Sequence, residues 1–398
     1  NKQLLLLNLW SNSLSGEIPI GVTTCPSLLR LNLNANRLQG TIPLELRQNH
    51  GLTELDLSQN QFHGGIIPEL GECMSLQSIN LAGNNLTGEI PSVLGGLQQL
   101  VILNISSNSL TGSIPSDLAN CSQLLQLDLS RNSLSRSIPE ELGRLSQLNR
   151  LLLSDNQLTG AIPQSLGNLT RLSELQLGGN NLSGEVPPAI GQIGSLQMAL
   201  NFSFNRLTGH LPSELGTLAL LEYLYLEENA FFGTIPQTFA SLKSLIVFNI
   251  SFNHFTGPLP SLLAFQQMPT SCFMGNDGLC GIPTLPACMS TVAPDFTSQK
   301  TTSIQRTVGM IAVVTGGAIM VITTIACWCL QRPATRLTPI EKSFASDSHL
   351  LSAPGISFHD ILQATHNFSA EYIIGKGACG IVYKAHMPSG LMIAVKRL

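Results

Sequence analysis

Eleven asparagines recur at a nearly constant interval along the first two-thirds of this 398-residue chain. Successive asparagines are 24 residues apart, with one 25-residue step before Asn205: Asn12, Asn36, Asn60, Asn84, Asn108, Asn132, Asn156, Asn180, Asn205, Asn229 and Asn253. A period of this length is typical of a solenoid, in which each repeat is one structural unit that stacks on the next. We therefore expect eleven stacked turns between residue 4 and about residue 262.

Each asparagine follows an L-x-L segment or a close variant, such as Leu55 and Leu57 before Asn60. This alternation predicts a short strand whose leucines point inward while the residues between them face outward. Stacked strands of this kind form a parallel sheet on one face of the solenoid. We expect the side-chain amide of each asparagine to satisfy unpaired backbone groups of neighbouring turns.

A glycine four residues after the asparagine and a proline seven residues after it complete the repeat. Ten of the eleven repeats have the glycine, and Arg136 replaces it in the remaining one. Ten repeats also have the proline at this place, and in the other one Pro68 is displaced by one position. The resulting form, L-x-x-L-x-L-x-x-N-x-L-x-G-x-I-P, resembles the plant-specific class of extracellular leucine-rich repeats. The resemblance implies an α/β leucine-rich-repeat solenoid over residues 1–262, a right-handed superhelix with a parallel concave sheet. Because Asn1 is not an initiator methionine and no signal-peptide cleavage site follows Leu7, we expect this domain to be truncated at its N-terminus.

Three cysteines within the repeats, Cys25, Cys73 and Cys121, are 48 residues apart. This spacing separates successive thiols by two turns, or roughly 10 Å. A disulfide requires Cα atoms within about 7 Å. The spacing therefore predicts buried core thiols and argues against a redox or metal site, and we expect no metal elsewhere.

The composition indicates a membrane segment, because 43% of the residues are hydrophobic and only 11% are charged. The 24 residues from 307 to 330 carry no charge, and as a helix they would be about 36 Å long, enough to cross the hydrocarbon core. A buried helix of a soluble domain would show polar residues at helical spacing. A weak excess of cations after the span, together with the N-x-S/T sequons before it, predicts repeats outside the cell and a C-terminal part in the cytosol. The net charge of −4 argues against nucleic acid as a partner.

Seven N-x-S/T sequons precede this apolar segment and are candidates for glycosylation: Asn85, Asn104, Asn120, Asn168, Asn181, Asn201 and Asn249. Cys280 and Cys288 resemble the paired cysteines that close such solenoids on the membrane side. The resemblance implies a disulfide in a cap over residues 263–289, followed by an extracellular juxtamembrane segment, 290–306. Cys272 is left as a free thiol or as an alternative partner.

The segment from Gly375 to Val382 fits G-x-G-x-x-G-x-V, and a second extended segment ends at Lys396. A dinucleotide-binding fold would open a helix after the third glycine, but β-branched residues continue an extended strand here. The alternative without function is a glycine-rich hairpin. We predict part of an ATP site, because the glycines would let backbone N–H groups approach phosphates and the lysine would neutralise them. Its candidate residues are Ile374, Gly375, Gly377, Gly380, Val382 and Lys396.

The segment Ile356–Ser369 resembles the stretch preceding the kinase domain of plant leucine-rich-repeat receptor-like kinases. The segments of this chain follow in the order of that family: repeats, cysteine cap, span (307–330), cytosolic linker (331–367) and kinase start (368–398, the β-rich N-lobe). The resemblance implies a plasma-membrane serine/threonine protein kinase that binds a secreted peptide, pairs with a co-receptor kinase and uses ATP with magnesium. The chain has no H-R-D or D-F-G motif, so we assign no catalytic residue and expect neither tight ATP binding nor phosphate transfer from these 398 residues. The alternative is a non-catalytic receptor or decoy.

A ligand would contact the outward strand positions, which lie six, four and two residues before each asparagine. Tyr223, Tyr225 and Glu227 are the candidates, because interfaces are enriched in aromatic residues. The R-x-R pair with which some family members bind a peptide's terminal carboxylate is absent from the repeats. Three sequons, at Asn104, Asn201 and Asn249, also occupy outward positions, and glycans there would leave turns six to eight and ten open.

Overall fold

The computed structural model describes residues 4–281, 285, 288, 364, 369–377, 380–386 and 392–397. The predicted span over 307–330 and the segments that flank it (290–306 and most of 331–367) lie outside the described residues.

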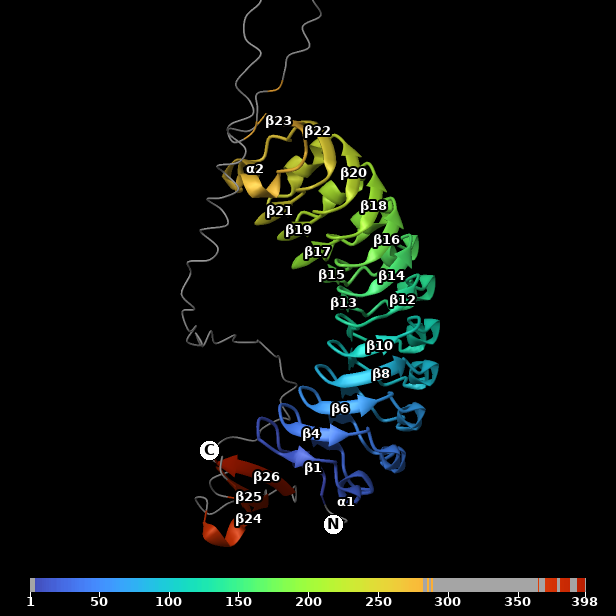
Figure 1. Ribbon diagram of the computed structural model, residues 1–398, viewed down its shortest axis with the longest axis vertical. Coiled ribbons are helices and arrows are strands. Elements are labelled where there is room, and N and C mark those ends of the chain that lie inside the picture. Colours follow the sequence, from blue (N-terminus) through green and yellow to red (C-terminus); the bar gives the residue numbers. More distant parts are fainter. Residues whose placement is uncertain are drawn as a thin grey trace, which may run out of the picture. The chain divides into compact units, whose positions relative to one another are not determined.

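The main feature of the repeats is an eleven-stranded parallel sheet, with one strand from each turn in sequence order. It runs along the inner side of a crescent-shaped stack (Figure 1). Its strands are β1 (Leu6–Asn8), β3 (Arg30–Asn32), β5 (Glu54–Asp56), β7 (Ser78–Asn80), β9 (Ile102–Asn104), β11 (Gln126–Asp128), β13 (Arg150–Leu152), β15 (Glu174–Gln176), β17 (Ala199–Asn201), β19 (Tyr223–Tyr225) and β21 (Val247–Asn249). From β3 to β21 the central residue of every strand is fully buried. The predicted solenoid and its eleven-stranded sheet are confirmed.

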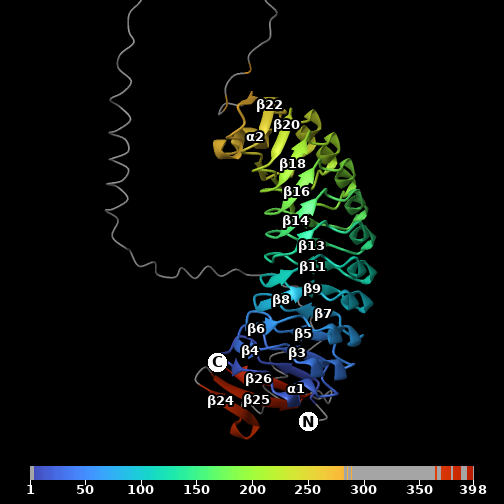
Figure 2. The same ribbon diagram turned by 45° about the vertical axis from the view of Figure 1, so that its right-hand side comes forward.

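The outer side of the crescent carries short helices (Figure 2). Nine of them are 3-10 helices of five residues: η1 (Leu44–Gln48), η2 (Pro68–Glu72), η3 (Ser92–Gly96), η4 (Ser116–Asn120), η5 (Glu140–Arg144), η6 (Gln164–Asn168), η7 (Pro188–Gln192), η8 (Ser213–Thr217) and η9 (Gln237–Ser241). The first turn instead has the α-helix α1 (Ile20–Thr23). The repeat proline directly precedes every one of these helices except η2, which begins at the displaced Pro68. The fixed φ of proline suits both places at the start of a helix. The strictly α-helical part of the solenoid is therefore small.

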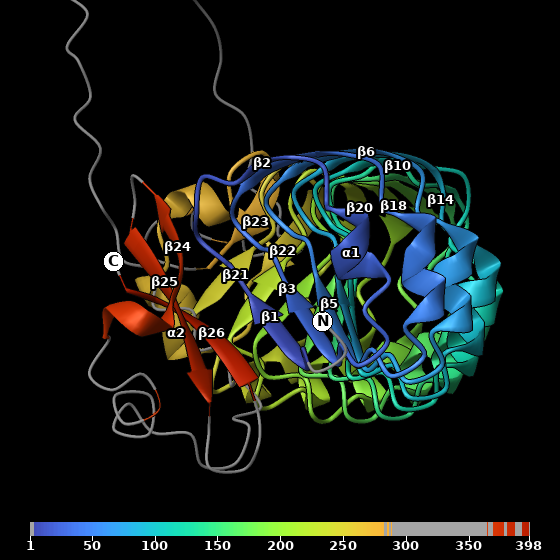
Figure 3. The ribbon, with the colours of Figure 1, turned by 90° about the horizontal axis from the view of Figure 1, so that it is seen from below.

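A second set of strands follows each asparagine and lines the side of the solenoid between the inner sheet and the helices, as the end view shows (Figure 3). One lateral sheet consists of β2 (Ser15–Gly16), β4 (Arg37–Gly40), β6 (Gln61–Gly64), β8 (Asn85–Glu89) and β10 (Ser109–Thr111). The other consists of β12 (Ser135–Arg136), β14 (Gln157–Gly160), β16 (Asn181–Gly184), β18 (Arg206–Gly209), β20 (Ala230–Gly233), β22 (His254–Pro258) and β23 (Gly278–Cys280). The break falls in the turn where Arg136 takes the place of the repeat glycine. Arg136 has φ 66°, a backbone conformation that favours glycine.

The repeat asparagines form a continuous hydrogen-bonded ladder. The Nδ2 of Asn60 donates to the carbonyl of Leu33 in the preceding turn (2.9 Å) and to that of Leu57 in its own turn (3.1 Å). Its Oδ1 accepts the N–H of Leu38 at 2.9 Å. The other asparagines from Asn36 to Asn253 repeat this pattern, for example Asn156. The predicted role of the amide is confirmed.

The ladder continues one step further than the sequence pattern predicted. Asn276 accepts the N–H of Phe255 at 2.9 Å and donates to the carbonyl of Ile250 at 2.9 Å. The region from 263 onward also contains α2 (Leu263–Gln267) and the 3-10 helix η10 (Thr270–Cys272). The cap is therefore a degenerate twelfth turn that covers the phenylalanine-rich end of the core.

Near the C-terminus, a 3-10 helix, η11 (Ala370–Tyr372), leads into a three-stranded antiparallel sheet. Its strands are β24 (Ile373–Gly377), β25 (Gly380–His386) and β26 (Met392–Arg397). The sequence predicted extended segments on both sides of a turn here. Residues 378–379 and 387–391 are outside the described residues.

Candidate functional site

The inner sheet presents an array of side chains from the outward strand positions. Two arginines at these positions, and a third beside them, each face a carboxylate one repeat further along. Arg30 pairs with Glu54 at 3.6 Å, and Arg150 with Glu174 at 2.7 Å. Arg131 lies directly before its repeat asparagine and pairs with Asp155 at 3.6 Å. Every one of these pairs joins residues 24 apart, so the repeat period itself brings the two charges together.

A hollow of about 570 Å³ opens on the inner face over β11 to β17. Its walls include Asp128, Ser154, Asp155, Gln176 and Phe204. The hydroxyl of Ser154 is buried and has no hydrogen-bond partner among the described residues. The hollow therefore has polar walls with one unused hydrogen-bonding group.

The turn that contains Gly178 presents Glu174 and Gln176 to the hollow but has no side chain at its third outward position. Gly178 occupies a strand position that carries serine in several other repeats, and Gly179 follows it. A Cβ atom added at Gly178 would lie 2.7 Å from Oδ1 of Asn201. The missing side chain thus lets the amide of Asn201 and the hydroxyl of Ser203 come close to the backbone of Gly178.

A chain of hydrogen bonds crosses three strands beside this hollow. Arg150 donates to Glu174, and Gln176 donates to the other oxygen of Glu174 at 3.1 Å. Asn201 donates to Oε1 of Gln176 at 2.9 Å and accepts the Ser203 hydroxyl at 2.7 Å. These bonds orient the amide and carboxylate groups, so a ligand would meet a pre-organised polar surface.

Tyr223, Tyr225 and Glu227 lie on the next turn toward the cap. The tyrosine rings are stacked, with centroids 6.3 Å apart and planes inclined by 16°. Oε2 of Glu227 is buried and unpartnered among the described residues. Burial raises the pKa of Glu227 and the charge of Glu228 raises it further, while hydrogen bonds from the backbone of Glu227 and Leu226 offset part of the rise. Burial also raises the pKa of Tyr225, with smaller contributions from Tyr223 and Glu227.

The sequons fall into two groups by exposure. Asn85, Asn120 and Asn168 are exposed, whereas Asn104, Asn181, Asn201 and Asn249 are half-buried. In Asn104, Asn201 and Asn249, Oδ1 accepts the hydroxyl of the serine two residues later. Asp56 and Asp128 accept a serine hydroxyl in the same way, so this N-x-S pattern also stabilises the strand. Glycosylation at the seven sites stays a prediction.

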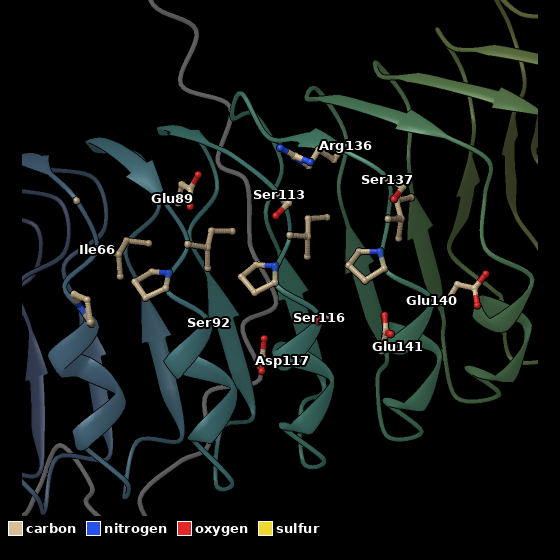
Figure 4. A pocket seen from close by; sticks show the side chains of 18 residues that line it. Ile66, Glu89, Ser92, Ser113, Ser116, Asp117, Arg136, Ser137, Glu140 and Glu141 are labelled. Carbon is tan, nitrogen blue, oxygen red and sulfur yellow. The ribbon is translucent and has the colours of Figure 1, made fainter.

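A wider depression of about 900 Å³ lies on the lateral side over the third to sixth turns (Figure 4). Arg136 and Glu89 lie toward its strand side, and Asp117 and Glu141 toward its helix side. Its remaining lining is largely the repeated I-P segment. This depression follows from the repeat geometry alone, whereas the inner hollow depends on residues specific to one turn.

The cysteines occupy different environments. Cys280 and Cys288 form a disulfide, with Cα atoms 5.0 Å apart. Cys25, Cys73 and Cys121 are buried, and Cys272 is a half-buried free thiol. Burial raises the pKa of both Cys73 and Cys121 to about 11, which disfavours the reactive thiolate.

The predicted nucleotide residues lie on the C-terminal sheet. Ile374, Gly375 and Gly377 are on β24, Gly380 and Val382 on β25, and Lys396 on β26. Gly377 pairs with Gly380, and Val382 with Lys396, across adjacent strands. The backbone thus brings the glycine segment and the lysine strand into one sheet.

The described residues contain no group of three or more His, Cys, Asp or Glu side chains that could hold a metal ion. Within the same residues, no helix is both long enough and apolar enough to cross a membrane.

Two protein-family models match the repeats. The family model described as "Leucine rich repeat" matches residues 74–134. A second, "Leucine Rich Repeat", matches 51–73, 147–169, 171–193, 198–218 and 220–242.

Among curated proteins, a probable leucine-rich repeat receptor-like protein kinase of Arabidopsis thaliana is 42% identical over 169 residues, or 40% of this chain and 15% of the relative. The receptor-like protein kinase PEPR1 of the same plant is 38% identical over 166 residues, or 39% of this chain and 14% of PEPR1. The chain thus spans only about a seventh of the length of these relatives.

Solved structures of plant receptor kinases show the same similarity. PEPR1–AtPEP1 is 40% identical with a TM-score of 0.66, covering 69% of this chain and 39% of that one. The Arabidopsis receptor kinase HAESA, in complex with the peptide hormone IDA and the co-receptor SERK1, is 39% identical with a TM-score of 0.67, covering 70% of this chain and 46% of that one. The repeats of this chain are therefore leucine-rich repeats homologous to the ectodomains of plant leucine-rich-repeat receptor-like kinases.

Proposed function

We propose that the solenoid is the extracellular, ligand-binding part of a plasma-membrane receptor and that it binds a peptide along its inner sheet. The observation that carries this proposal is the hollow over β11 to β17, bordered by the hydrogen-bonded chain from Arg150 to Ser203. The solved relatives PEPR1–AtPEP1 and HAESA with IDA support a peptide as the ligand.

The chemistry of the hollow suits a peptide backbone. An extended peptide presents both N–H donors and carbonyl acceptors, and each must be matched when it leaves water. The carboxylate of Asp155 and the Gln176 carbonyl can accept, while the Ser154 hydroxyl can do either. Phe204, at the border of the hollow, is 57% exposed and offers an apolar contact for a ligand side chain.

Selection from a random peptide library tests this proposal. The purified 398-residue chain is expected to enrich specific peptides, and hydrogen exchange is expected to show protection on β11 to β19 when they bind. Asn201→Ala and Gly178→Leu should each reduce binding at least tenfold, the first by breaking the polar chain and the second by displacing the Asn201 amide and the Ser203 hydroxyl that lie against Gly178. Gly96→Ala on the outer helices serves as the matched control. Enriched peptides that protect only the outer 3-10 helices would contradict the proposal.

We propose further that the intact receptor pairs with a co-receptor kinase and phosphorylates proteins on serine or threonine, using ATP with magnesium. The pairing of the glycine-rich strand with the lysine-bearing sheet supports an ATP site. We expect no transfer of radiolabelled phosphate by the 398-residue chain. A longer transcript encoding H-R-D and D-F-G motifs would favour the kinase, and an early stop the non-catalytic receptor or decoy.

A further inference from the structure

The inner face carries an excess of negative charge. Its outward strand positions and the residues directly before each asparagine hold seven acidic residues: Glu54, Asp56, Asp128, Asp155, Glu174, Glu227 and Glu228. The same positions hold three basic residues, Arg30, Arg131 and Arg150. Each arginine is already paired with one of the carboxylates. Four carboxylates therefore have no cation opposite them on this face.

The four carboxylates are not equivalent. Asp56 and Asp128 each accept the N–H and hydroxyl of a nearby serine, and Glu228 is exposed to water. Glu227 differs, because its Oε2 is shielded from solvent and has no partner among the described residues. A buried carboxylate oxygen without a donor is costly, and its neighbour Glu228 adds like-charge repulsion. The residue as a whole is partly exposed, so a cation can approach the carboxylate from its open side and offset the charge that burial disfavours.

The surroundings of Glu227 are aromatic. Tyr225 precedes it by two residues on the same face and stacks on Tyr223. One repeat earlier, the N–H of Phe204 donates to the backbone carbonyl of Glu227 at 2.9 Å. One repeat later stands Phe252, whose side chain is 47% exposed. We call these five residues (Phe204, Tyr223, Tyr225, Glu227 and Phe252) the acidic–aromatic patch.

The two phenylalanines are held outward by the backbone. Phe204 has φ 51° and Phe252 has φ 54°, in the left-handed region that bulky residues rarely adopt. They occupy the position directly before the repeat asparagine, where the turn leaves the strand. Phe204 also borders the hollow on β11 to β17. The acidic–aromatic patch is therefore continuous with the proposed peptide site.

We propose that the acidic–aromatic patch binds a lysine or arginine side chain of the ligand, with its cation against Glu227 and its stem along Tyr225. This inference rests on the proposed function and names the chemistry of one ligand residue. Arginine and lysine are attracted to aromatic faces, and a carboxylate nearby strengthens the contact. Apolar residues beside the basic one would contact Phe204 and Phe252, so the favoured sequence is apolar, basic, apolar.

The test uses two peptides that differ only in charge. Acetyl-Phe-Arg-Phe-amide and the same peptide with citrulline in place of arginine are titrated into the 398-residue chain, and binding is followed by ligand-observed magnetic resonance. We expect the arginine peptide to bind at least tenfold more tightly. Glu227→Gln should remove that preference. Glu214→Gln, which neutralises an exposed carboxylate on an outer helix, should leave it intact.

Equal binding of the two peptides to the parent chain, or a preference that persists in Glu227→Gln, would overturn the inference. Glu227→Asp provides a second variant that keeps the charge, and it should retain part of the preference if the fold is unchanged. If library selection yields peptides that bind the inner sheet but contain no basic residue, this inference fails while the receptor proposal stands. If no peptide is enriched at all, the receptor proposal itself fails.

Discussion

Nε of Arg150 lies 2.7 Å from Oε2 of Glu174, and the two residues are direct neighbours on β13 and β15. The side chain of Glu174 is only 11% exposed. Because the carboxylate is largely removed from water, its partner matters more than in a surface pair. The repeat period thus places an ion pair where it stiffens the border of the proposed peptide site.

Replacing Arg150 should destabilise its turn. We expect Arg150→Gln to reduce local stability by about 1–2 kcal/mol, since it leaves a mostly buried carboxylate without a cation. Arg131→Gln breaks a pair of the same spacing whose side chains are 72% and 60% exposed, and it should have little effect. Hydrogen exchange of the Leu151 and Leu175 amides measures the local stability in both variants. Equal losses in the two variants would contradict this account.

Asn156 offers a test of the ladder. Asn156→Ala removes the acceptor for the N–H of Leu134 and the donor for the carbonyls of Leu129 and Leu153. Each buried group left unmatched costs about 1–3 kcal/mol, and the Leu134 amide should lose its exchange protection. Asn156→Asp keeps the oxygen acceptor but loses the N–H donor. It should therefore also destabilise the turn, yet preserve more exchange protection at Leu134 than Asn156→Ala does. Exposed Asn149→Ala is the control, and a similar effect there would refute the ladder's role.

Gly95 and Gly96, adjacent in η3, should respond in opposite directions to alanine. A Cβ atom at Gly95 would lie 2.2 Å from the carbonyl oxygen of Asp117 in the next turn, whereas one at Gly96 would meet nothing within 4 Å. We expect Gly95→Ala to cost about 1–3 kcal/mol through overpacking. Gly96→Ala should be neutral or stabilising by up to about 1 kcal/mol. Urea denaturation midpoints of the two variants measure the difference, and a stabilised Gly95→Ala would show that the turns can move apart.

The 24-residue period was enough to predict the stacked turns, the inner sheet and the asparagine ladder, because each depends on residues that recur. Asn276 was missed because it follows Asn253 by 23 residues and its leucine, Leu279, comes one position late. The three cross-repeat ion pairs could have been found by comparing residues 24 apart on the outward positions and directly before each asparagine. The lateral strands have only a glycine and an asparagine as markers, and these do not specify pairing between turns.

The candidate site was harder to predict. Tyr223, Tyr225 and Glu227 could be placed on the outward face from their positions alone. The polar border of the hollow depends on Gly178, which leaves space for the Asn201 side chain, and on how Asn201 turns toward Gln176. Neither follows from a periodic pattern. The burial of the unpartnered oxygen of Glu227 depends on how the turns pack in three dimensions, which the sequence of one turn does not contain.

The buried thiols of Cys73 and Cys121 should make stability fall in alkaline solution. Their pKa is about 11 in the folded chain, against 9.0 without the fold. Between pH 9 and pH 11 the unfolded chain loses these protons while the folded chain keeps them, so the free energy of unfolding falls as pH rises. Each thiol can contribute up to about 2.5 kcal/mol across this window.

The double variant Cys73→Val with Cys121→Val isolates this effect. We expect its urea midpoint to fall less steeply between pH 9 and pH 11 than that of the parent chain. Cys272→Val controls for exchange between the half-buried thiol and the Cys280–Cys288 disulfide, and it should retain most of the parent's slope. Parallel pH profiles for the parent and the double variant would show that the thiols ionise without opening the core. That result would contradict this account, because both thiols are 0% exposed in the fold.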